Sequence, residues 1–302
     1  MLTISEAENI IKTINACHHL DARLRERCQG GEQGAFYVEG EDGSNYILKH
    51  TSPDKVEMLQ QIGRVIACLY ELGYPAPRYA CVGATEALAY SLQEALPGIP
   101  LEALRQREQL ERLLKLNTLQ RGQASGLCLP CNWPTPVVET VLVGGDGFCI
   151  LDTLRQHSTA SVELLARCQE IVRTHADAVE NRADIVHLDF HFHNILVHDD
   201  EISGVIDWDG CLGGDATFDL VTLLFYSYSN HLMYGDDGGY VQELWLIARE
   251  ESGLSALRVY LAHMLVRQVE WSLRLHERSV AEHWLRVARM VLRDLHAGIP
   301  LA

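Results

Sequence analysis

The sequence predicts an α+β fold of two lobes, in which a small antiparallel β-sheet with one helix precedes a larger, mainly helical lobe. Up to about Ala95, apolar residues occur in short runs separated by turns, which is typical of β-strands. After the turn Leu96–Gly98, apolar residues recur mostly at helical spacing. A chain of 302 residues is long enough to bury a core in each lobe. We therefore expect an N-terminal lobe over residues 1–95 and a C-terminal lobe over residues 96–302.

Four strands are expected in the first lobe. Gly34–Glu39 and Tyr46–His50 flank the turn EDGSN (41–45), which is the pattern of a β-hairpin closed by a Gly/Asn turn. Two further short apolar runs, Tyr79–Val82 and Leu88–Gln93, follow later in the chain. These four runs predict the small sheet.

One helix is expected between these strands. Ser52–Asp54 provides an N-cap and a first turn, apolar residues recur at helical spacing from Val56 to Leu69, and Gly73–Pro75 ends the run. Residues 124–147, in the second lobe, are the least regular part and are expected to form a lid, a surface excursion or a variable loop. Four segments of the second lobe have helical spacing: Leu101–Leu119, Val162–Val179, Leu257–Leu275 and Val280–Leu295.

The charge of the chain disfavours several classes of partner. Its 41 acidic and 25 basic side chains give a net charge of -16, which repels phosphate backbones and anionic lipid surfaces. Nucleic-acid and membrane partners are therefore disfavoured, and a cationic partner is favoured. The N-terminal sequence lacks a basic segment followed by an apolar run, and no stretch approaches the ~18 apolar residues of a membrane span. We expect a cytoplasmic protein.

The nine cysteines are scattered along the chain. An odd number without an export signal argues against a disulfide framework, so the thiols are expected to be reduced. Cys128 and Cys131 form a CxxC pair, but a structural zinc site needs a second pair of ligands at matching spacing. We interpret the pair as a loop with two thiols.

The stretch HLDFHFHNIL (187–196) carries the residues best suited to chemistry. Asp189 and Asn194 lie five positions apart between apolar runs, and Asp207 ends the next apolar run. The two segments are joined by the turn HDDEIS (198–203), so they predict a hairpin that carries the three side chains to one end. A phosphoryl-transfer enzyme needs such a set: one carboxylate near the acceptor hydroxyl, and an amide oxygen plus a second carboxylate for Mg²⁺.

A nucleotide site also needs a cation and a phosphate loop in the first lobe. Lys49 ends the strand YILK, and three glycines precede it on the strand-turn-strand, Gly30, Gly31 and Gly34. Glu57, on the following helix, could pair with Lys49 and fix its ammonium group against the phosphates. Asp54 is the alternative acidic partner.

In their order along the chain, these motifs resemble those of the aminoglycoside phosphotransferase family, the small-molecule branch of the protein-kinase-like fold. Each stretch alone is weak, whereas the ordered set is specific. The resemblance covers nearly the whole chain through the glycine-containing hairpin, Lys49, the helix with Glu57, GYPAPRY (73–79), QEALPG (93–98), HLDFHFHNIL, GVIDWDG (204–210) and GDATFDL (214–220).

The resemblance implies a role for each candidate residue. Asp189 would be the catalytic base, and Asn194 and Asp207 the magnesium ligands. Lys49 would contact the α- and β-phosphates, with Glu57 as its partner. The remaining implied roles are Gly31 and Gly34 near the phosphates, the backbone of Glu94 to Leu96 as the adenine-binding hinge, and His187 and Asp219 as supports of the catalytic loop.

The sequence departs from the family pattern in three places. Leu188 stands where a small residue is usual, and His193 precedes the asparagine; both positions set the path of the loop backbone. The glycine loop GGEQGAF (30–36) is not GxGxxG, which predicts a looser phosphate cover than in protein kinases.

The expected activity is ATP- or GTP-dependent phosphorylation of a hydroxyl on a small cationic molecule, with Mg²⁺. Net acidity favours an aminoglycoside or a related antibiotic, so the chain would be a resistance kinase, acting as a monomer or weak dimer. The alternative is a metabolic kinase of the choline, homoserine or sugar type, or a macrolide kinase. Acidic residues that could hold a cationic substrate are Asp209, Asp236, Asp237, Glu243 and Glu270.

Two other classes remain open. His191 and His193 form an HxH pair like that of metal-dependent hydrolases, although barrel-type hydrolases place this pair near the start of a repeated β/α chain. Stoichiometric zinc in protein purified without added metal would favour that class. The other class is a nucleotide-binding regulator that has lost catalysis. All four residues expected to act on the nucleotide, the metal and the acceptor are present, which favours an active enzyme instead: Lys49, Asp189, Asn194 and Asp207.

Overall fold

The computed structural model describes residues 2–28, 34–127, 129, 132–145, 149–235 and 238–300. It divides into two compact units, and each is described by itself. The first unit comprises Met1–Pro100 and Ile195–Asp209, and the second comprises Leu101–Asn194 and Gly210–Ala302.

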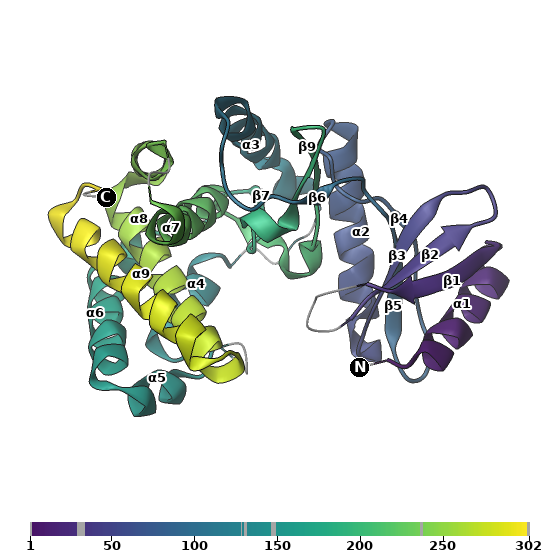
Figure 1. Cartoon of the computed structure of the whole chain (residues 1–302), viewed down its shortest axis with the longest axis horizontal. Coiled ribbons are helices and arrows are strands. Elements are labelled where there is room, and N and C mark those ends of the chain that lie inside the picture. The colour runs from purple at the N-terminus through teal and green to yellow at the C-terminus, as the bar shows by residue number, and fades with distance from the viewer. Residues whose placement is uncertain are drawn as a thin grey trace. The chain divides into compact units, whose positions relative to one another are not determined.

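An antiparallel sheet of five strands forms the centre of the first unit, in the order β1-β2-β3-β5-β4 (Figure 1). β3 pairs with β5 from Tyr46 opposite Glu94 to Thr51 opposite Ala89. The four expected strands are confirmed, and β1 is an additional edge strand. The strand bounds are β1 Ala22–Arg27, β2 Phe36–Gly40, β3 Asn45–Thr51, β4 Tyr79–Ala84 and β5 Ala89–Glu94.

Two helices cover the two faces of this sheet (Figure 1). α1 (Ile4–His18) begins at Thr3, which forms a capping box with Glu6. α2 (Val56–Glu71), the expected helix, buries its apolar stripe against β4 and β5. Every residue of β5 from Ala89 to Gln93 is buried, because both faces of the strand are covered. The core on the α1 face includes Ile10, Ile11, Ile14, Phe36, Val38, Leu48, Tyr90 and Leu92.

A second sheet, of order β6-β8-β9, brings residues 195–209 into the first unit. An added Cβ at Gly98 would lie 2.6 Å from the backbone oxygen of Val197, and the φ of Gly98 is +119°, so this close approach requires glycine. The bounds are β6 Ile99–Pro100, β8 Ile195–His198 and β9 Glu201–Val205.

The observed units therefore differ from a single division of the chain near residue 95. The first unit extends to Pro100 and takes in the expected hairpin of β8 and β9, because β6 pairs with β8. Sequence periodicity that divides the chain at one point cannot show that a later segment joins the first unit. The assignment of nucleotide binding to residues 1–95 and of catalysis and substrate binding to residues 96–302 stays a prediction.

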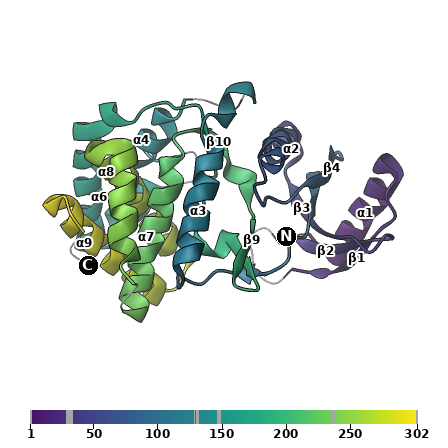
Figure 2. The same ribbon diagram turned by 90° about the horizontal axis from the view of Figure 1, so that it is seen from above.

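Helices dominate the second unit, where α8 packs against α4, α6, α7 and α9 (Figure 2). α8 is interrupted at Gly253, whose φ of 79° and ψ of 157° are not helical. Two short strands, β7 (Asp184–Val186) and β10 (Leu212–Gly214), pair antiparallel beside the helices. The helix bounds are α3 Arg107–Gln120, α4 Pro134–Leu142, α5 Leu151–His157, α6 Thr159–His175, α7 Thr217–Tyr234, α8 Tyr240–Leu275 and α9 Arg278–Ala297.

The buried indole of Trp133 joins β10 to α8. Its Nε1–H donates to the hydroxyl of Tyr260 at 3.1 Å, and that hydroxyl donates to Oδ2 of Asp215 at 2.9 Å. A Cβ on Gly214 would come within 2.5 Å of the indole ring, so β10 can pass this closely only with glycine there. This network fixes the start of α7, where Oδ1 of Asp215 accepts the N–H of Thr217 at 2.9 Å.

The expected helical segments all contain helix, but the interpretation of residues 124–147 as a lid or irregular loop was incomplete, because α4 lies within them. Pro134 occupies the first turn of α4, where the missing N–H has no intrahelical partner to lose, and the preceding Trp133 anchors the turn in the core. Cys128 and Cys131 lie outside the described residues. Among the described helices, none has the length and apolar character needed to cross a lipid bilayer.

Candidate active site

The loop that follows β7 is anchored by Asp219, in the first turn of α7. Oδ2 of Asp219 accepts the backbone N–H of His187 at 2.9 Å and the Nε2–H of Gln120 at 2.7 Å, while Oδ1 accepts the N–H of Leu188 at 3.1 Å. Asp219 is fully buried, and burial raises the pKa of its carboxyl to about 7, although these three donors favour the ionised form. His187 is also fully buried, and its Nδ1 accepts the N–H of Asp189 at 3.3 Å. The loop start is thus held through its backbone.

Leu188 adopts a left-handed backbone conformation, with φ of +72°. A branched aliphatic residue rarely does so, because its Cβ crowds the backbone. The small residue usual at this position would avoid that cost. The departure seen in the sequence therefore coincides with local strain, which the surrounding hydrogen bonds hold in place.

Asp189 has donors at both carboxylate oxygens. Nη2 of Arg267, from α8, donates to Oδ1 at 3.0 Å. Nε2 of His191 lies 3.3 Å from Oδ2, and Nδ2 of Asn194 donates to Oδ2 at 3.2 Å and to the backbone oxygen of Asp189 at 2.9 Å. The sequence-predicted base and one predicted magnesium ligand are therefore in direct contact.

Hydrogen bonds assign the atoms that face Asp189. Nδ1 of His191 accepts the N–H of His193 at 3.2 Å, so the hydrogen of the neutral ring lies on Nε2, which donates to Asp189. The amide nitrogen of Asn194 is also used on Asp189, which leaves its Oδ1 as the atom that could bind a hard cation. The ring of Tyr226, on α7, packs 4.7 Å from that of His191 and supports it.

The carboxyl of Asp189 is kept ionised. Burial raises its pKa, but the hydrogen bond from His191 and the charge of Arg267 lower it more, so the pKa lies well below the usual range. Such a carboxylate is a weak base and a good acceptor. This suits phosphoryl transfer, in which orienting the hydroxyl matters more than basicity.

Lys49 and two acidic residues form a separate cluster in the first unit. Nζ of Lys49, on β3, lies 2.5 Å from Oδ1 of Asp207 and 3.1 Å from Oδ2 of Asp209. Burial lowers the pKa of the ammonium group, but the charges of Asp209 and Asp207 raise it above its ordinary value. Beside the cluster, Lys49 and Asp209 line a pocket of about 140 Å³ with Met58 and Leu59. The ammonium group is therefore charged and locally enclosed.

The expected ion pair between Lys49 and Glu57 is not formed in this structure. Glu57 is exposed in the first turn of α2, whereas Asp207 and Asp209 hold the ammonium group. The sequence places Glu57 near Lys49 along the chain, but the hairpin of β8 and β9 delivers closer carboxylates. Asp54, the alternative, is also exposed, and its ion-pair partner is Lys55 at 3.9 Å.

Asp207 is presented by a strained turn after β9. Its φ of +69° is left-handed, and the next residue, Trp208, is buried with its Nε1–H donating to the backbone oxygen of Val205 at 2.9 Å. The indole also packs edge-on to Tyr74 at 5.4 Å. The buried tryptophan thereby holds the exposed Asp207 carboxylate in place.

The expected hinge and phosphate loop also belong to the first unit. The N–H groups of Glu94 and Ala95 already donate to the backbone oxygens of Arg78 and Asn45, at 2.7 and 2.9 Å. Of the three residues of the predicted hinge, Leu96 is the one whose N–H takes no part in these two bonds. Gly34 has φ of +77°, which suits a turn before β2, and Gly31 lies outside the described residues.

Three of the acidic substrate candidates are each paired with a basic side chain. Asp209 is paired with Lys49, and Glu243 is paired with Arg107. Glu270 is fully buried and paired with Arg274 at 2.7 Å, so its carboxylate is not exposed to a cationic substrate in this structure. α8 is surrounded by helices, which the sequence pattern alone did not reveal. Asp236 and Asp237 lie outside the described residues.

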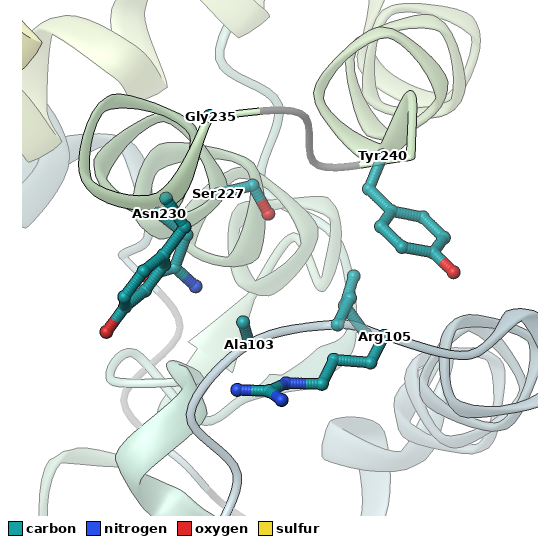
Figure 3. Close-up of a pocket in the computed structure, with 8 residues that line it drawn as sticks. Ala103, Arg105, Ser227, Asn230, Gly235 and Tyr240 are labelled. Carbon is teal, nitrogen blue, oxygen red and sulfur yellow. The ribbon is translucent and has the colours of Figure 1, made fainter.

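A pocket of about 290 Å³ lies in the second unit, between the segment that precedes α3, the end of α7 and the start of α8 (Figure 3). Ser227 and Asn230 come from one wall, Arg105 from the facing segment and Tyr240 from α8. Nδ2 of Asn230 donates to the backbone oxygen of Glu102 at 3.1 Å and ties two of these walls together. Hydroxyl, amide, guanidinium and aromatic groups in one hollow suit a polyhydroxylated ring.

Each predicted magnesium ligand offers an oxygen of the kind that Mg²⁺ binds. Among the described residues there is no group of three or more His, Cys, Asp or Glu side chains arranged for a metal. Mg²⁺ at nucleotide sites needs only one or two protein oxygens, because phosphates and water supply the rest. Oδ1 of Asn194 and the carboxylate of Asp207, each within its own unit, are oxygens of this kind.

A family model described as "Phosphotransferase enzyme family" matches residues 24–260, which is most of the chain. The chain belongs to this family. The resemblance and the enzyme class expected from it are confirmed, and so is the two-lobed, kinase-like α+β fold. This phosphotransferase is thus no longer a candidate for the barrel-type zinc hydrolase class.

Solved structures similar to this phosphotransferase include two aminoglycoside phosphotransferases and a macrolide phosphotransferase. APH(4)-Ia has a TM-score of 0.69 and 17% identity, over 95% of this chain and 99% of that one. APH(3'')-Id from Streptomyces rimosus has a TM-score of 0.53 and 19% identity, over 87% of this chain and 99% of that one. Macrolide 2'-phosphotransferase type I has a TM-score of 0.59 and 16% identity, over 94% of this chain and 97% of that one. No curated protein matches the chain. At these identities the likeness establishes the fold.

One site residue of this phosphotransferase was missed by sequence reasoning. Arg267 was not among the expected site residues, but it bonds to Asp189. The two residues are 78 positions apart, and no short motif joins them. A cation at helical spacing from buried positions of α8 was the only available signal.

Proposed function

We propose that this phosphotransferase moves the γ-phosphoryl group of ATP or GTP to a hydroxyl of a small molecule. The observation that carries the proposal is the carboxylate of Asp189, which is ionised and held by Arg267, His191 and Asn194. A carboxylate oriented in this way can align an acceptor hydroxyl. Alignment and charge neutralisation provide most of the catalysis in kinases.

In the proposed reaction, Asp189 accepts the hydroxyl proton as the acceptor oxygen bonds to the γ-phosphorus. The bond from that phosphorus to the bridging oxygen breaks, and its electron pair remains on the β-phosphate. Lys49 exchanges its carboxylate partners for α- and β-phosphate oxygens. Asn194 and Asp207 would hold Mg²⁺, which would supply positive charge against the phosphates. His187 and Asp219 keep the loop in place.

An aminoglycoside or a related cationic antibiotic is the proposed acceptor class. The net charge of -16 attracts cations, and a thermostable mutant of APH(4)-Ia was solved in a ternary complex with AMP-PNP and hygromycin B. A neutral acceptor, such as a macrolide or a metabolic alcohol, is the second candidate. It is favoured by Arg105, because a guanidinium group in the pocket wall would repel a polycation.

We also propose that the enzyme works in the cytoplasm as a monomer or weak dimer. Its proposed phosphoryl donors are cytoplasmic nucleotides, and its acceptor is a small molecule that needs no second subunit.

A screen of nucleotide consumption tests the proposal. ATP and GTP are compared in the presence of Mg²⁺ with aminoglycosides, macrolides, choline, homoserine and sugars as acceptors. We expect one acceptor class to stimulate consumption in the wild-type protein and not in Asp189→Asn. Stimulation confined to neutral or anionic metabolites would overturn the antibiotic assignment, and equal stimulation in Asp189→Asn would overturn the role of Asp189.

A further inference from the structure

Arg267 makes two contacts with consecutive residues of the catalytic loop. Its Nη1 donates to the backbone oxygen of Leu188 at 3.0 Å, and its Nη2 donates to Oδ1 of Asp189 at 3.0 Å. The Arg267 side chain is only 17% exposed, and it projects from α8, a helix packed on several sides. One planar group therefore joins the loop backbone and the loop carboxylate to a rigid element.

The first contact acts on a strained peptide. Leu188 has φ of +72°, its N–H is bonded to Asp219, and its carbonyl is bonded to Arg267. Both hydrogen-bonding groups of this residue are therefore held by side chains from α7 and α8. Strained conformations persist where the surroundings over-determine them, and this one lies directly before Asp189.

The second contact fixes the plane of the carboxylate. Arg267 holds Oδ1, while His191 and Asn194 lie on the Oδ2 side. The fork of a guanidinium group is planar and rigid, so bonds from its two terminal nitrogens set both the position of the loop and the rotation of the carboxylate. An ammonium group offers charge without that geometry.

We propose that Arg267 is a positioning residue for the catalytic carboxylate of Asp189, acting through the side chain of Asp189 and the carbonyl of Leu188. The proposal rests on the proposed function, because it assumes that Asp189 orients the acceptor hydroxyl. Loss of these two contacts of Arg267 lets the carboxylate of Asp189 rotate and the loop relax, which slows phosphoryl transfer. Nucleotide contacts of Lys49 belong to the first unit and are not altered directly.

A purely structural ion pair is the competing explanation, and α8 contains one for comparison. Arg274, two turns along the same helix, pairs with the fully buried Glu270 at 2.7 Å. Nε and Nη2 of Arg274 donate to the two carboxylate oxygens of Glu270, at 2.7 and 3.3 Å. Arg274→Ala is therefore the matched control, because it removes an arginine of α8 and its ion pair with a buried carboxylate.

The test measures kcat and the nucleotide KM for Arg267→Ala, Arg267→Lys and Arg274→Ala in the full chain. We expect kcat to fall about 100-fold in Arg267→Ala and about 10-fold in Arg267→Lys, with the nucleotide KM within about threefold of wild type. Added guanidinium ion should restore part of kcat in Arg267→Ala. Arg274→Ala should lower the unfolding temperature while keeping kcat within about threefold.

Three results would overturn the proposal: a kcat near wild type in Arg267→Ala, a nucleotide KM that rises as much as kcat falls, or an equal loss of kcat in Arg274→Ala. If Arg267→Ala does not fold, Arg267→Lys gives the same decision, since it keeps the charge. A double-mutant cycle of Arg267→Lys with Asp189→Asn, read by unfolding temperature, needs no acceptor. Additive effects of the two substitutions would show that Arg267 and Asp189 do not act together, which would refute the proposal. A wild-type protein that phosphorylates no acceptor would refute only the proposed function.

Discussion

Oδ1 of Asp219 accepts the backbone N–H of Leu188 at 3.1 Å, immediately before Asp189 in the chain. Through this bond and a second one to the N–H of His187, a buried carboxylate of α7 holds the start of the catalytic loop. Asp219 and the two loop residues that it holds, 31 and 32 positions earlier in the chain, are therefore parts of one local structure.

Asp219→Asn should destabilise the protein and disturb the loop. The carboxylate accepts three hydrogen bonds, whereas an amide has one acceptor oxygen and would turn an N–H₂ group toward donors. We expect the free energy of unfolding to fall by about 2 kcal/mol, with a loss of kcat. Urea unfolding gives the first quantity. A stability equal to wild type would show that the buried bonds are dispensable.

The same residue should give stability a specific pH dependence. Burial raises the pKa of Asp219 from 3.8 to about 7, so the folded state keeps a proton that the unfolded state releases. Its contribution is therefore fully present below about pH 4 and is lost as the pH rises to about 7. Urea midpoints measured at pH 5 and pH 8 should differ more in wild type than in Asp219→Asn. Parallel pH profiles would contradict the shift.

Leu188 allows a test of backbone strain with two variants. Leu188→Ile conserves volume but adds β-branching at φ of +72°, so we expect a loss of about 1–2 kcal/mol in the free energy of unfolding. Leu188→Gly removes apolar contacts but relieves strain, and we expect a change within about 1 kcal/mol. Thermal unfolding compares the two. The reverse order of stability would argue against strain at this position.

Lys49→Met should weaken nucleotide binding. The ammonium group of Lys49 is paired with Asp207 and Asp209. Without it, these two carboxylates are no longer neutralised and would repel the phosphates of a nucleotide bound at the proposed position. We expect nucleotide affinity to fall by about 10- to 100-fold, with Lys49→Arg intermediate because it keeps the charge. Calorimetric titration with an ATP analogue and Mg²⁺ measures this. Unchanged affinity would remove Lys49 from the nucleotide site.

Much of the fold could be predicted because its elements have strong local patterns. β2, β3 and α2 follow from the alternation and spacing of apolar residues between clear turn signals. α4 was missed because its nine residues follow a Pro- and Cys-rich segment, and their burial depends on Trp133 packing against Gly214. The entry of residues 195–209 into the first unit was missed because it depends on pairing between distant strands.

The proposed site was predictable where one motif carries its residues. Asp189 and Asn194 are five positions apart, and their contact follows from the loop itself. Arg267 and the Lys49–Asp209 pair are contacts at separations of 78 and 160 residues, which the sequence pattern does not encode locally. Glu57 was favoured by nearness in sequence, but the returning hairpin placed other carboxylates beside Lys49.

The most direct test of the central claim is single-turnover phosphate transfer by Asp189→Asn, compared with wild type on the acceptor found by the nucleotide screen. Phosphorylated acceptor is measured by mass spectrometry, and nucleotide affinity is measured in parallel. If Asp189 orients the hydroxyl and takes its proton, the rate should fall by about 10³-fold or more while nucleotide affinity stays near wild type. Transfer at a rate close to that of wild type would contradict the account.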